Sequence, residues 1–257
     1  MKAYAKINWA LRVTGKRPDG FHNIETLFQT ISLHDDLTFE RADRFSLTCD
    51  DPTIPIDETN LVARAATAIG ASARIHLQKR IPAGGGLGGG SSDAAAVLRE
   101  FNRKDPQIAL SLGSDVPFFL EGGTAYATGR GEVLTPLRRV APVPLLLLIP
   151  AERVLTAQAY GMLRRFSPPL GIDRYRAMID DDLLDHATEL INDFEEAIFA
   201  KFPHLHALKT RLYEVGAAWA AMSGSGSTIV GAFRSQADRD AAVTRFAGVR
   251  AIACETV

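Results

Sequence analysis

The stretch Pro-Ala-Gly-Gly-Gly-Leu-Gly-Gly-Gly-Ser-Ser-Asp, residues 82–93, carries the strongest signal in this sequence. Six glycines fall within positions 84–90. Glycine loses more conformational entropy on folding than any other residue, so this density is unfavourable unless the backbone must approach something closely. We therefore predict a loop whose backbone comes close to a ligand.

The chemistry of that ligand follows from what flanks the loop. A strand is predicted over residues 74–79, and a helix capped by Ser91 or Ser92 follows, with Ala94, Val97, Leu98 and Phe101 on its inner face. The start of a helix offers unpaired N–H groups and the positive end of its dipole, and consecutive N–H groups in a loop form an anion nest. A phosphate group is thus the expected ligand, and a flexible surface loop is the competing interpretation.

Two familiar nucleotide motifs fit poorly. Gly84, Gly86 and Gly89 match G-x-G-x-x-G, but the loop is not the first turn of a βαβ unit and no suitable acidic residue follows. A Walker A loop requires Gly-Lys-Ser/Thr, and here no lysine precedes the serines. The positive charge must come from elsewhere, and Lys6 is the best candidate.

Lys6 lies in a segment of alternating character. Ala5, Ile7, Trp9, Leu11 and Val13 share one face and Lys6, Asn8 and Arg12 the other, which predicts a half-buried strand. A turn at 15–20 and strands at 23–33 and 37–42 complete an expected antiparallel meander. A helix capped by Thr59 and a strand at 118–127 are also expected.

The second half predicts a buried strand at 143–149 and a different order of elements. Helices are expected at 156–166, 188–202, 204–215 and 236–246, and strands at 217–222, 228–233 and 249–254. Strands and helices mix without βαβ repetition, which favours an α+β fold. The basic, proline-rich segment 138–144 suggests a domain boundary, so we expect domains at 1–141 and 142–257.

Composition excludes several classes of protein. The chain has 257 residues, 46% of them hydrophobic and 23% charged, with a net charge of −1, as in ordinary globular proteins. That charge gives no bulk attraction to nucleic acid or to an anionic membrane. Without an apolar N-terminal signal or a membrane-length run, we expect a cytoplasmic protein in which Cys49 and Cys254 are reduced.

The glycine-rich stretch resembles the phosphate-binding motif of the GHMP kinases, and the turn Met222–Ser227 resembles their C-terminal motif. This resemblance implies a two-domain GHMP kinase fold, with an N-terminal nucleotide-binding α+β domain and a C-terminal ferredoxin-like α/β sandwich. It also implies that ATP and Mg²⁺ are used. The Mg²⁺ ligands stay open.

Three further segments resemble the GHMP kinases that phosphorylate the 2-hydroxyl of 4-diphosphocytidyl-2-C-methyl-D-erythritol, in isoprenoid precursor synthesis. They are residues 5–8, 15–22 and 112–119. Phe21 stands where these kinases often have tyrosine, which keeps a stacking ring but not a phenolic hydrogen bond. The stretch between Phe101 and Leu112 is also shorter than usual.

The resemblance assigns roles to individual residues. Asp115 is the expected catalytic base and Lys6 its electrostatic partner. The expected ATP-binding residues are Pro82, Ala83, Gly84, Gly85, Gly86, Leu87, Gly88, Gly89, Gly90, Ser91 and Ser92. The expected substrate-binding residues are Asn8, Phe21, His22, Gly224 and Ser225, with Phe21 stacking on cytosine and His22 bonding its edge. The partner is then a small molecule with a cytidine diphosphate group, bound by a monomer or weak homodimer.

Two alternatives remain. One is a GHMP kinase of the homoserine or mevalonate type, whose substrate has no base for Phe21 to stack on. The other is a non-catalytic nucleotide-binding regulator on the same fold, which would need neither Lys6 nor Asp115.

Overall fold

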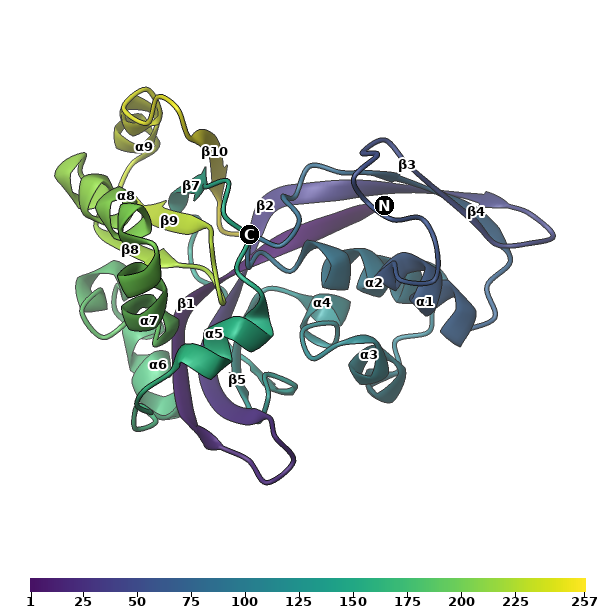
Figure 1. Cartoon of the computed structure of the whole chain (residues 1–257), viewed down its shortest axis with the longest axis horizontal. Coiled ribbons are helices and arrows are strands. Elements are labelled where there is room, and N and C mark those ends of the chain that lie inside the picture. The colour runs from purple at the N-terminus through teal and green to yellow at the C-terminus, as the bar shows by residue number, and fades with distance from the viewer. The chain divides into compact units, whose positions relative to one another are not determined.

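The computed structural model describes residues 1–257 and mixes strands with mostly short helices (Figure 1). The strands are β1 Lys2–Lys16, β2 His22–Arg41, β3 Ser46–Cys49, β4 Ala73–Gln78, β5 Thr124–Thr128, β6 Val133–Pro136, β7 Pro144–Ile149, β8 Trp219–Met222, β9 Ile229–Ala232 and β10 Arg250–Glu255. The helices are α1 Leu61–Ala68, α2 Gly89–Glu100, α3 Pro106–Leu112, α4 Phe118–Glu121, α5 Thr156–Met162, α6 Ile172–Asp180, the 3-10 helix η1 Leu183–His186, α7 Phe194–Lys201, α8 Pro203–Glu214 and α9 Gln236–Val243. The predicted α+β class is confirmed. None of the helices combines the length and hydrophobicity that a membrane crossing requires.

The chain forms two compact units that do not follow chain order. The first contains Met1–Lys6, Leu33–Ala83 and Gly88–Gly122, and the second contains Ile7–Ser32, Gly84–Leu87 and Gly123–Val257. Strands β1 and β2 each contribute residues to both units. The boundary expected between residues 141 and 142 stays a prediction.

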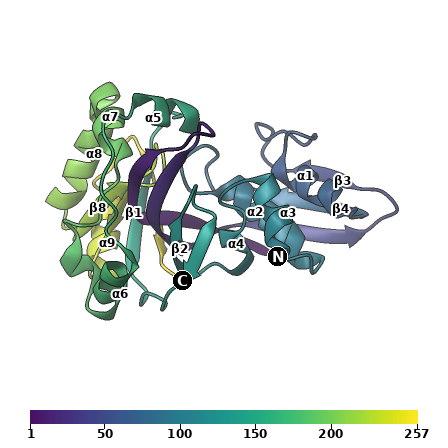
Figure 2. The ribbon, with the colours of Figure 1, turned by 90° about the horizontal axis from the view of Figure 1, so that it is seen from below.

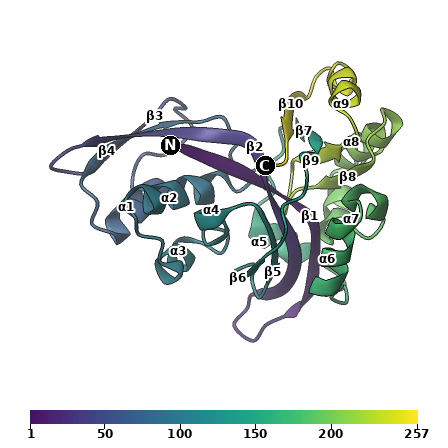
Figure 3. The same cartoon turned by 180° about the vertical axis from the view of Figure 1, so that it is seen from behind.

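The first unit is a sheet covered by helices. Strand β4 pairs antiparallel with the second half of β2 and parallel with β3, and helices α1 to α4 all lie on one face of these strands (Figures 1 and 3). The core contains Leu37, Ile75 and Leu77 from the strands and the buried run Ala94–Leu98 from α2. Helix α2, which follows the glycine-rich loop, is therefore the central helix of this layer.

The second unit contains an antiparallel sheet of order β10-β7-β9-β8. Its strands and main helices follow one another as βαββαβ, and this order is that of a ferredoxin-like fold, which confirms the predicted C-terminal sandwich. Helices α8 and α9 pack on the sheet, as Figure 2 shows. Leu145–Leu148 of β7 are all fully buried, which explains their unbroken apolar run.

Several expected elements differ. The two strands predicted at 23–33 and 37–42 are one strand, β2. The polar residues His34, Asp35 and Asp36 lie between the two predicted strands, but Asp35 is buried and its carboxylate is satisfied by the backbone N–H groups of Arg80 and Ile81. The strand therefore continues through them, and the predicted meander is wrong.

Helix ends account for further differences. Asn60, not Thr59, caps α1, since its side chain accepts a 2.8 Å hydrogen bond from the N–H of Val62. Helix α2 begins at Gly89, before the expected serine cap. The strand predicted at 118–127 is instead α4 followed by β5. A short apolar run fits a buried helix turn as well as a strand, so periodicity cannot decide between them.

Candidate functional site

The glycine-rich loop enters α2 through Gly88. Gly88 is the N-cap residue, with φ of 71°, and no side chain caps the helix. The first N–H groups of a helix have no intrahelical partner. The start of α2 thus supplies the donors and the dipole end that the sequence predicted for phosphate, although the serines are not its cap: Ser92 is buried and its hydroxyl donates to the carbonyl oxygen of Tyr4 at 2.7 Å.

Two glycines of the loop are required by packing within the protein. A Cβ on Gly88 would lie 2.6 Å from the Phe119 ring and 3.2 Å from Cγ of Lys6. A Cβ on Gly86 would lie 2.0 Å from the carbonyl oxygen of Ser223. Both residues also have positive φ, of 71° and 76°, which side chains rarely tolerate. The backbone is thus closely packed against the protein's own atoms at these two glycines, and close approach of the loop to a ligand stays a prediction.

Lys6 and Asp115 form an ion pair beside the start of α2. Nζ of Lys6 lies 3.7 Å from a carboxylate oxygen of Asp115, and the lysine side chain is 4% exposed against 34% for the aspartate. Burial lowers the pKa of Lys6 below its usual value, and the negative charge of Asp115 opposes that shift. The structure therefore brings the two predicted catalytic residues together, with the carboxylate on the accessible side.

Asn8 lies two residues after Lys6 on β1 and is buried. Its amide nitrogen donates to Oγ1 of Thr26 at 2.7 Å, and that hydroxyl donates to the carbonyl oxygen of Ala10 at 2.6 Å. The amide is thus already oriented by the strand pair β1–β2. A contact between Asn8 and substrate stays a prediction.

The predicted base-binding pair has aromatic neighbours on the His22 side, and we call Phe21, His22, Tyr160 and Phe166 the aromatic cluster. Phe21 is 51% exposed, and the guanidinium of Arg130 lies 4.5 Å from its ring centre. His22 stacks on Tyr160, with ring centres 4.7 Å apart and planes at 15°, and Phe166 lies 5.9 Å from it. Burial, with a smaller contribution from the charge of Lys16, lowers the pKa of His22 below its usual value. An uncharged imidazole that can donate and accept is therefore expected at neutral pH.

The partners in this cluster left no signal in the sequence. Phe166 is 47% exposed and lies in an irregular segment after α5 that was expected to be helical. That segment is held by Glu25, a buried residue of β2 whose carboxylate accepts N–H hydrogen bonds from Leu170 at 2.7 Å and Gly171 at 2.9 Å. Residues so far apart in the chain form no pattern that a single sequence would show.

The C-terminal glycine-serine turn supports the first part of the loop. The hydroxyl of Ser223 donates to the carbonyl oxygen of Gly86 at 2.9 Å. The side-chain amide of buried Asn192 donates to the carbonyl oxygens of Met222 and Gly224 at 2.6 and 2.8 Å. Ser225 is 9% exposed, and its hydroxyl shares a 3.1 Å hydrogen bond with Thr156. The turn therefore holds the first part of the glycine-rich loop in place. Substrate binding by Gly224 and Ser225 stays a prediction.

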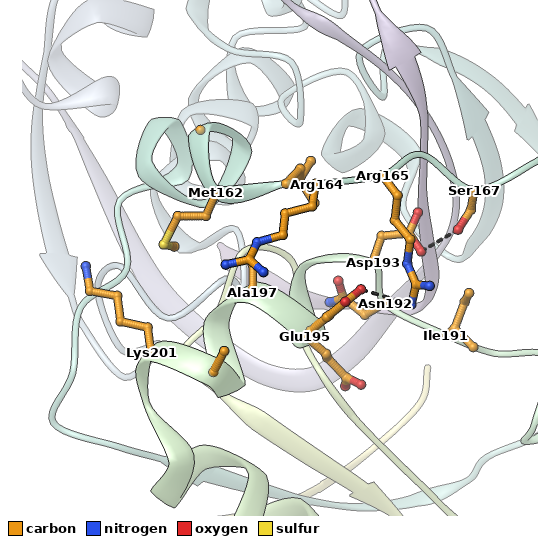
Figure 4. Close-up of a pocket in the computed structure, with 14 residues that line it drawn as sticks. Met162, Arg164, Arg165, Ser167, Ile191, Asn192, Asp193, Glu195, Ala197 and Lys201 are labelled. Atoms are coloured by element: carbon orange, nitrogen blue, oxygen red, sulfur yellow. Dashed lines mark hydrogen bonds and ion pairs between the residues drawn. The ribbon is translucent and has the colours of Figure 1, made fainter.

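A pocket of about 860 Å³ lies in the second unit, between the end of α5 with the segment that follows it and helix α7 (Figure 4). None of the residues predicted as site residues lines it. Asn192 does, so one wall of the pocket carries the amide that anchors the glycine-serine turn.

Two family models match parts of this chain. Residues 60–123 match the model of the GHMP kinases N terminal domain, and residues 176–249 match that of the GHMP kinases C terminal domain. The 4-diphosphocytidyl-2-C-methyl-D-erythritol kinase of Chlorobium chlorochromatii (strain CaD3) is 41% identical over 263 residues, covering 94% of this chain and 91% of that protein.

Two further similar proteins extend the match. The protein of the same name from Chlorobium luteolum (strain DSM 273 / BCRC 81028 / 2530) is 43% identical over 262 residues, covering 95% of this chain and 91% of that protein. A crystal structure of 4-(cytidine 5'-diphospho)-2C-methyl-D-erythritol kinase is 36% identical and superposes with a TM-score of 0.85, over 100% of this chain and 98% of that one.

Proposed function

Because the chain belongs to the GHMP kinases, and within them to the family of the 4-diphosphocytidyl-2-C-methyl-D-erythritol kinases, we propose that it phosphorylates the 2-hydroxyl of 4-diphosphocytidyl-2-C-methyl-D-erythritol with ATP. This reaction supplies isoprenoid precursors by the methylerythritol phosphate pathway. The observation that carries the proposal is the Lys6–Asp115 ion pair, 3.7 Å long, beside the start of α2.

The chemistry follows from that arrangement. The substrate's 2-oxygen forms a bond to the γ-phosphorus, the bond from that phosphorus to the β,γ-bridging oxygen breaks, and ADP leaves. Asp115 accepts the hydroxyl proton as general base. Lys6, held in a low-dielectric setting, stabilises charge on the transferred phosphoryl group, and the N–H groups at the start of α2 hold the nucleotide's phosphates. Phosphoryl transfer needs little from a protein beyond such positioning and charge stabilisation.

Mg²⁺ would neutralise phosphate charge in this reaction. Such an ion commonly rests on substrate phosphates with one or two carboxylates, rather than in a cage of protein ligands. The structure contains no group of three or more His, Cys, Asp or Glu side chains that could hold a metal ion, and Asp115 is already used as the general base. These features fit a metal carried mainly by the nucleotide, with protein ligands left open.

Base recognition rests on the aromatic cluster. The exposed ring of Phe21 offers a stacking face, and the neighbouring His22 offers a donor and an acceptor for the edge of a pyrimidine. Homoserine and mevalonate carry no base for this surface. A pure regulator would have no use for a buried lysine paired with an accessible carboxylate.

Other features stay predictions. They are a cytoplasmic location, a monomer or weak homodimer, and the absence of nucleic-acid and membrane partners.

An ATP-consumption assay across candidate substrates tests the proposal. We expect turnover with 4-diphosphocytidyl-2-C-methyl-D-erythritol and little with homoserine, mevalonate or methylerythritol phosphate. Equal turnover of substrates with and without the cytidine group would reject the substrate and leave the kinase activity. No turnover with any of them, despite ATP binding, would favour the regulator.

A further inference from the structure

A buried ionic cluster lies directly behind the start of α2. Nζ of Lys79 forms ion pairs with Asp35 and, at 3.0 Å, with Asp93. The three side chains are 7%, 0% and 3% exposed. No role in the reaction proposed above uses any of them.

The cluster ties together three parts of the chain around the phosphate loop. Asp35 lies in the middle of β2, and its second oxygen accepts the N–H of Ile81 at 2.8 Å, just before the loop begins. Asp93 is the fifth residue of α2, just after the loop ends. Between them, a Cβ on Gly89 would lie 3.0 Å from Ile81 and 3.2 Å from Nζ of Lys79. The entry to the loop and its exit are thus fixed to one ammonium group.

The charges in this cluster do not balance when all three groups are ionised. One ammonium faces two carboxylates, which leaves one negative charge in the interior. Oδ1 of Asp93 is also buried and has no hydrogen-bond partner. An ionised oxygen without a partner is costly in such a place, whereas a protonated carboxyl would leave the cluster neutral.

The pKa shifts of Asp93 and Lys79 agree with a neutral cluster that contains one proton on a carboxylate. Burial raises the pKa of Asp93 to about 7, against the opposing effect of Lys79 and with a further contribution from Asp35. Burial alone lowers the pKa of Lys79, but the two carboxylates more than offset it, so the ammonium stays charged. No other charged group contributes to the shift of Asp93.

We propose that Lys79, Asp35 and Asp93 form a proton-linked cluster that positions the phosphate loop, and that nucleotide binding at the start of α2 draws a proton onto Asp93. This inference rests on the proposed function, which places nucleotide phosphates at that helix end. Asp93 lies about 6 Å along the axis from the first residue of α2, since each residue rises about 1.5 Å. A negative charge there repels phosphate, whereas a neutral cluster does not. By linkage, phosphate favours the protonated state to the same extent.

The test is calorimetric titration with MgADP, without substrate, between pH 6 and pH 8.5. In the wild type we expect the Kd for MgADP to rise about tenfold more across this range than in Asp93→Asn, which carries no charge at any pH. Both proteins bind the same nucleotide, so the ionisation of the nucleotide changes the two Kd values equally and does not affect their ratio. Titrations at pH 7 in buffers of different ionisation enthalpy should show proton uptake by the wild type and markedly less by the variant.

Matched variants separate this role from a structural one. Glu121→Gln removes an exposed acid of the same unit and should keep the wild-type pH profile. If Asp93→Asn does not fold, Asp35→Asn leaves one carboxylate for one ammonium and should also flatten the profile. Identical pH profiles in wild type and folded variant, or no proton uptake by the wild type, would overturn the inference while leaving the kinase activity intact. A wild-type protein that does not bind MgADP would overturn both.

Discussion

The start of α2 and the aromatic cluster around His22 are built in opposite ways. Around α2 the charged groups are paired, and Lys6 is buried: its side chain is 4% exposed and its Nζ lies 3.7 Å from a carboxylate oxygen of Asp115. In the aromatic cluster the rings of Phe21 and Phe166 are 51% and 47% exposed. A charge gains strength from a low-dielectric setting, whereas a stacking ring must be open to its partner. Changes around α2 should therefore affect catalysis and stability, and changes in the cluster should affect substrate affinity.

The largest effect is expected for Asp115→Asn, which removes the general base without changing its shape. Turnover should fall about 10²–10⁴-fold, while MgADP and substrate bind nearly as before, because the half-exposed carboxylate contributes little to packing. Steady-state kinetics with nucleotide titration measure both. A variant with nearly wild-type kcat would remove Asp115 from this role.

Lys6→Ala should lower kcat about 10²–10³-fold, the usual result of removing one preorganised electrostatic group. Lys6→Arg should not restore activity, since a planar guanidinium needs room that the Gly88 contact does not leave. Lys2→Ala, at an exposed position of the same strand, is the control and should keep full activity. Full turnover in either Lys6 variant contradicts the assignment.

Gly88→Ala sharpens the comparison by adding one methyl group beside Lys6. The new Cβ would meet the Phe119 ring at 2.6 Å in a backbone conformation with φ of 71°. We expect the free energy of unfolding to fall by about 2–4 kcal/mol, from strain and overpacking together. Denaturant unfolding measures the change.

Gly161→Ala is the matched control for that substitution. Gly161 lies in α5 without a positive φ, and a Cβ added there would meet nothing within 4 Å beyond its chain neighbours and the backbone of its own helix. Alanine should therefore stabilise the protein slightly. Equal stability of Gly88→Ala and the wild type would mean that the loop yields easily at this point.

The same contrast explains which parts of the molecule a sequence can predict. The alternation of β1, the apolar run of β7 and the glycine-rich loop are local patterns, and the structure has a strand, a buried strand and a loop at these places. The sequence predicts two strands where the structure has the single strand β2, and Asp35 lies between the two predicted ranges. Only Lys79 and the backbone after it, more than 40 residues away, make that aspartate acceptable there.

The aromatic cluster also depends on contacts between residues that are far apart in the sequence. A motif predicts Phe21 and His22, but the ring partners of His22 lie far along the chain: Tyr160 in α5 and Phe166 in the segment after it. Even the β1 strand was expected to be half-buried, whereas Lys6 and Asn8 are buried on its polar face. Long-range partners decide these features, and no local spacing encodes them.

In the aromatic cluster, Phe21→Leu should raise the KM for the diphosphocytidyl substrate about 5–150-fold and leave that for ATP unchanged. Base–aromatic stacking contributes about 1–3 kcal/mol, measured mainly with nucleic acids. Phe21→Tyr keeps the ring and adds a hydroxyl at an exposed edge, so it should be nearly neutral. If Phe21→Leu lowered kcat instead of raising KM, the division between the two regions would fail.

The smallest effect is expected for His22→Ala, and it concerns selectivity more than affinity. Cytosine presents an amino donor where uracil presents a carbonyl acceptor, and an uncharged imidazole can match only one of them at a given nitrogen. Removing it should narrow the preference for cytidine over uridine substrates by about 5–10-fold, the value of one hydrogen bond. Because burial lowers the pKa of His22, wild-type selectivity should hold from neutral pH upward and weaken only as acid protonates the ring.

His206→Ala is the control for His22→Ala, since that histidine stacks on Phe199 in helix α7 and takes no part in the cluster. Steady-state kinetics with paired cytidine and uridine substrates at several pH values measure the cytidine preference of the wild type, of His22→Ala and of the control. An unchanged cytidine preference in His22→Ala would transfer base selection to other groups of the cluster and leave His22 as a stacking partner of Tyr160.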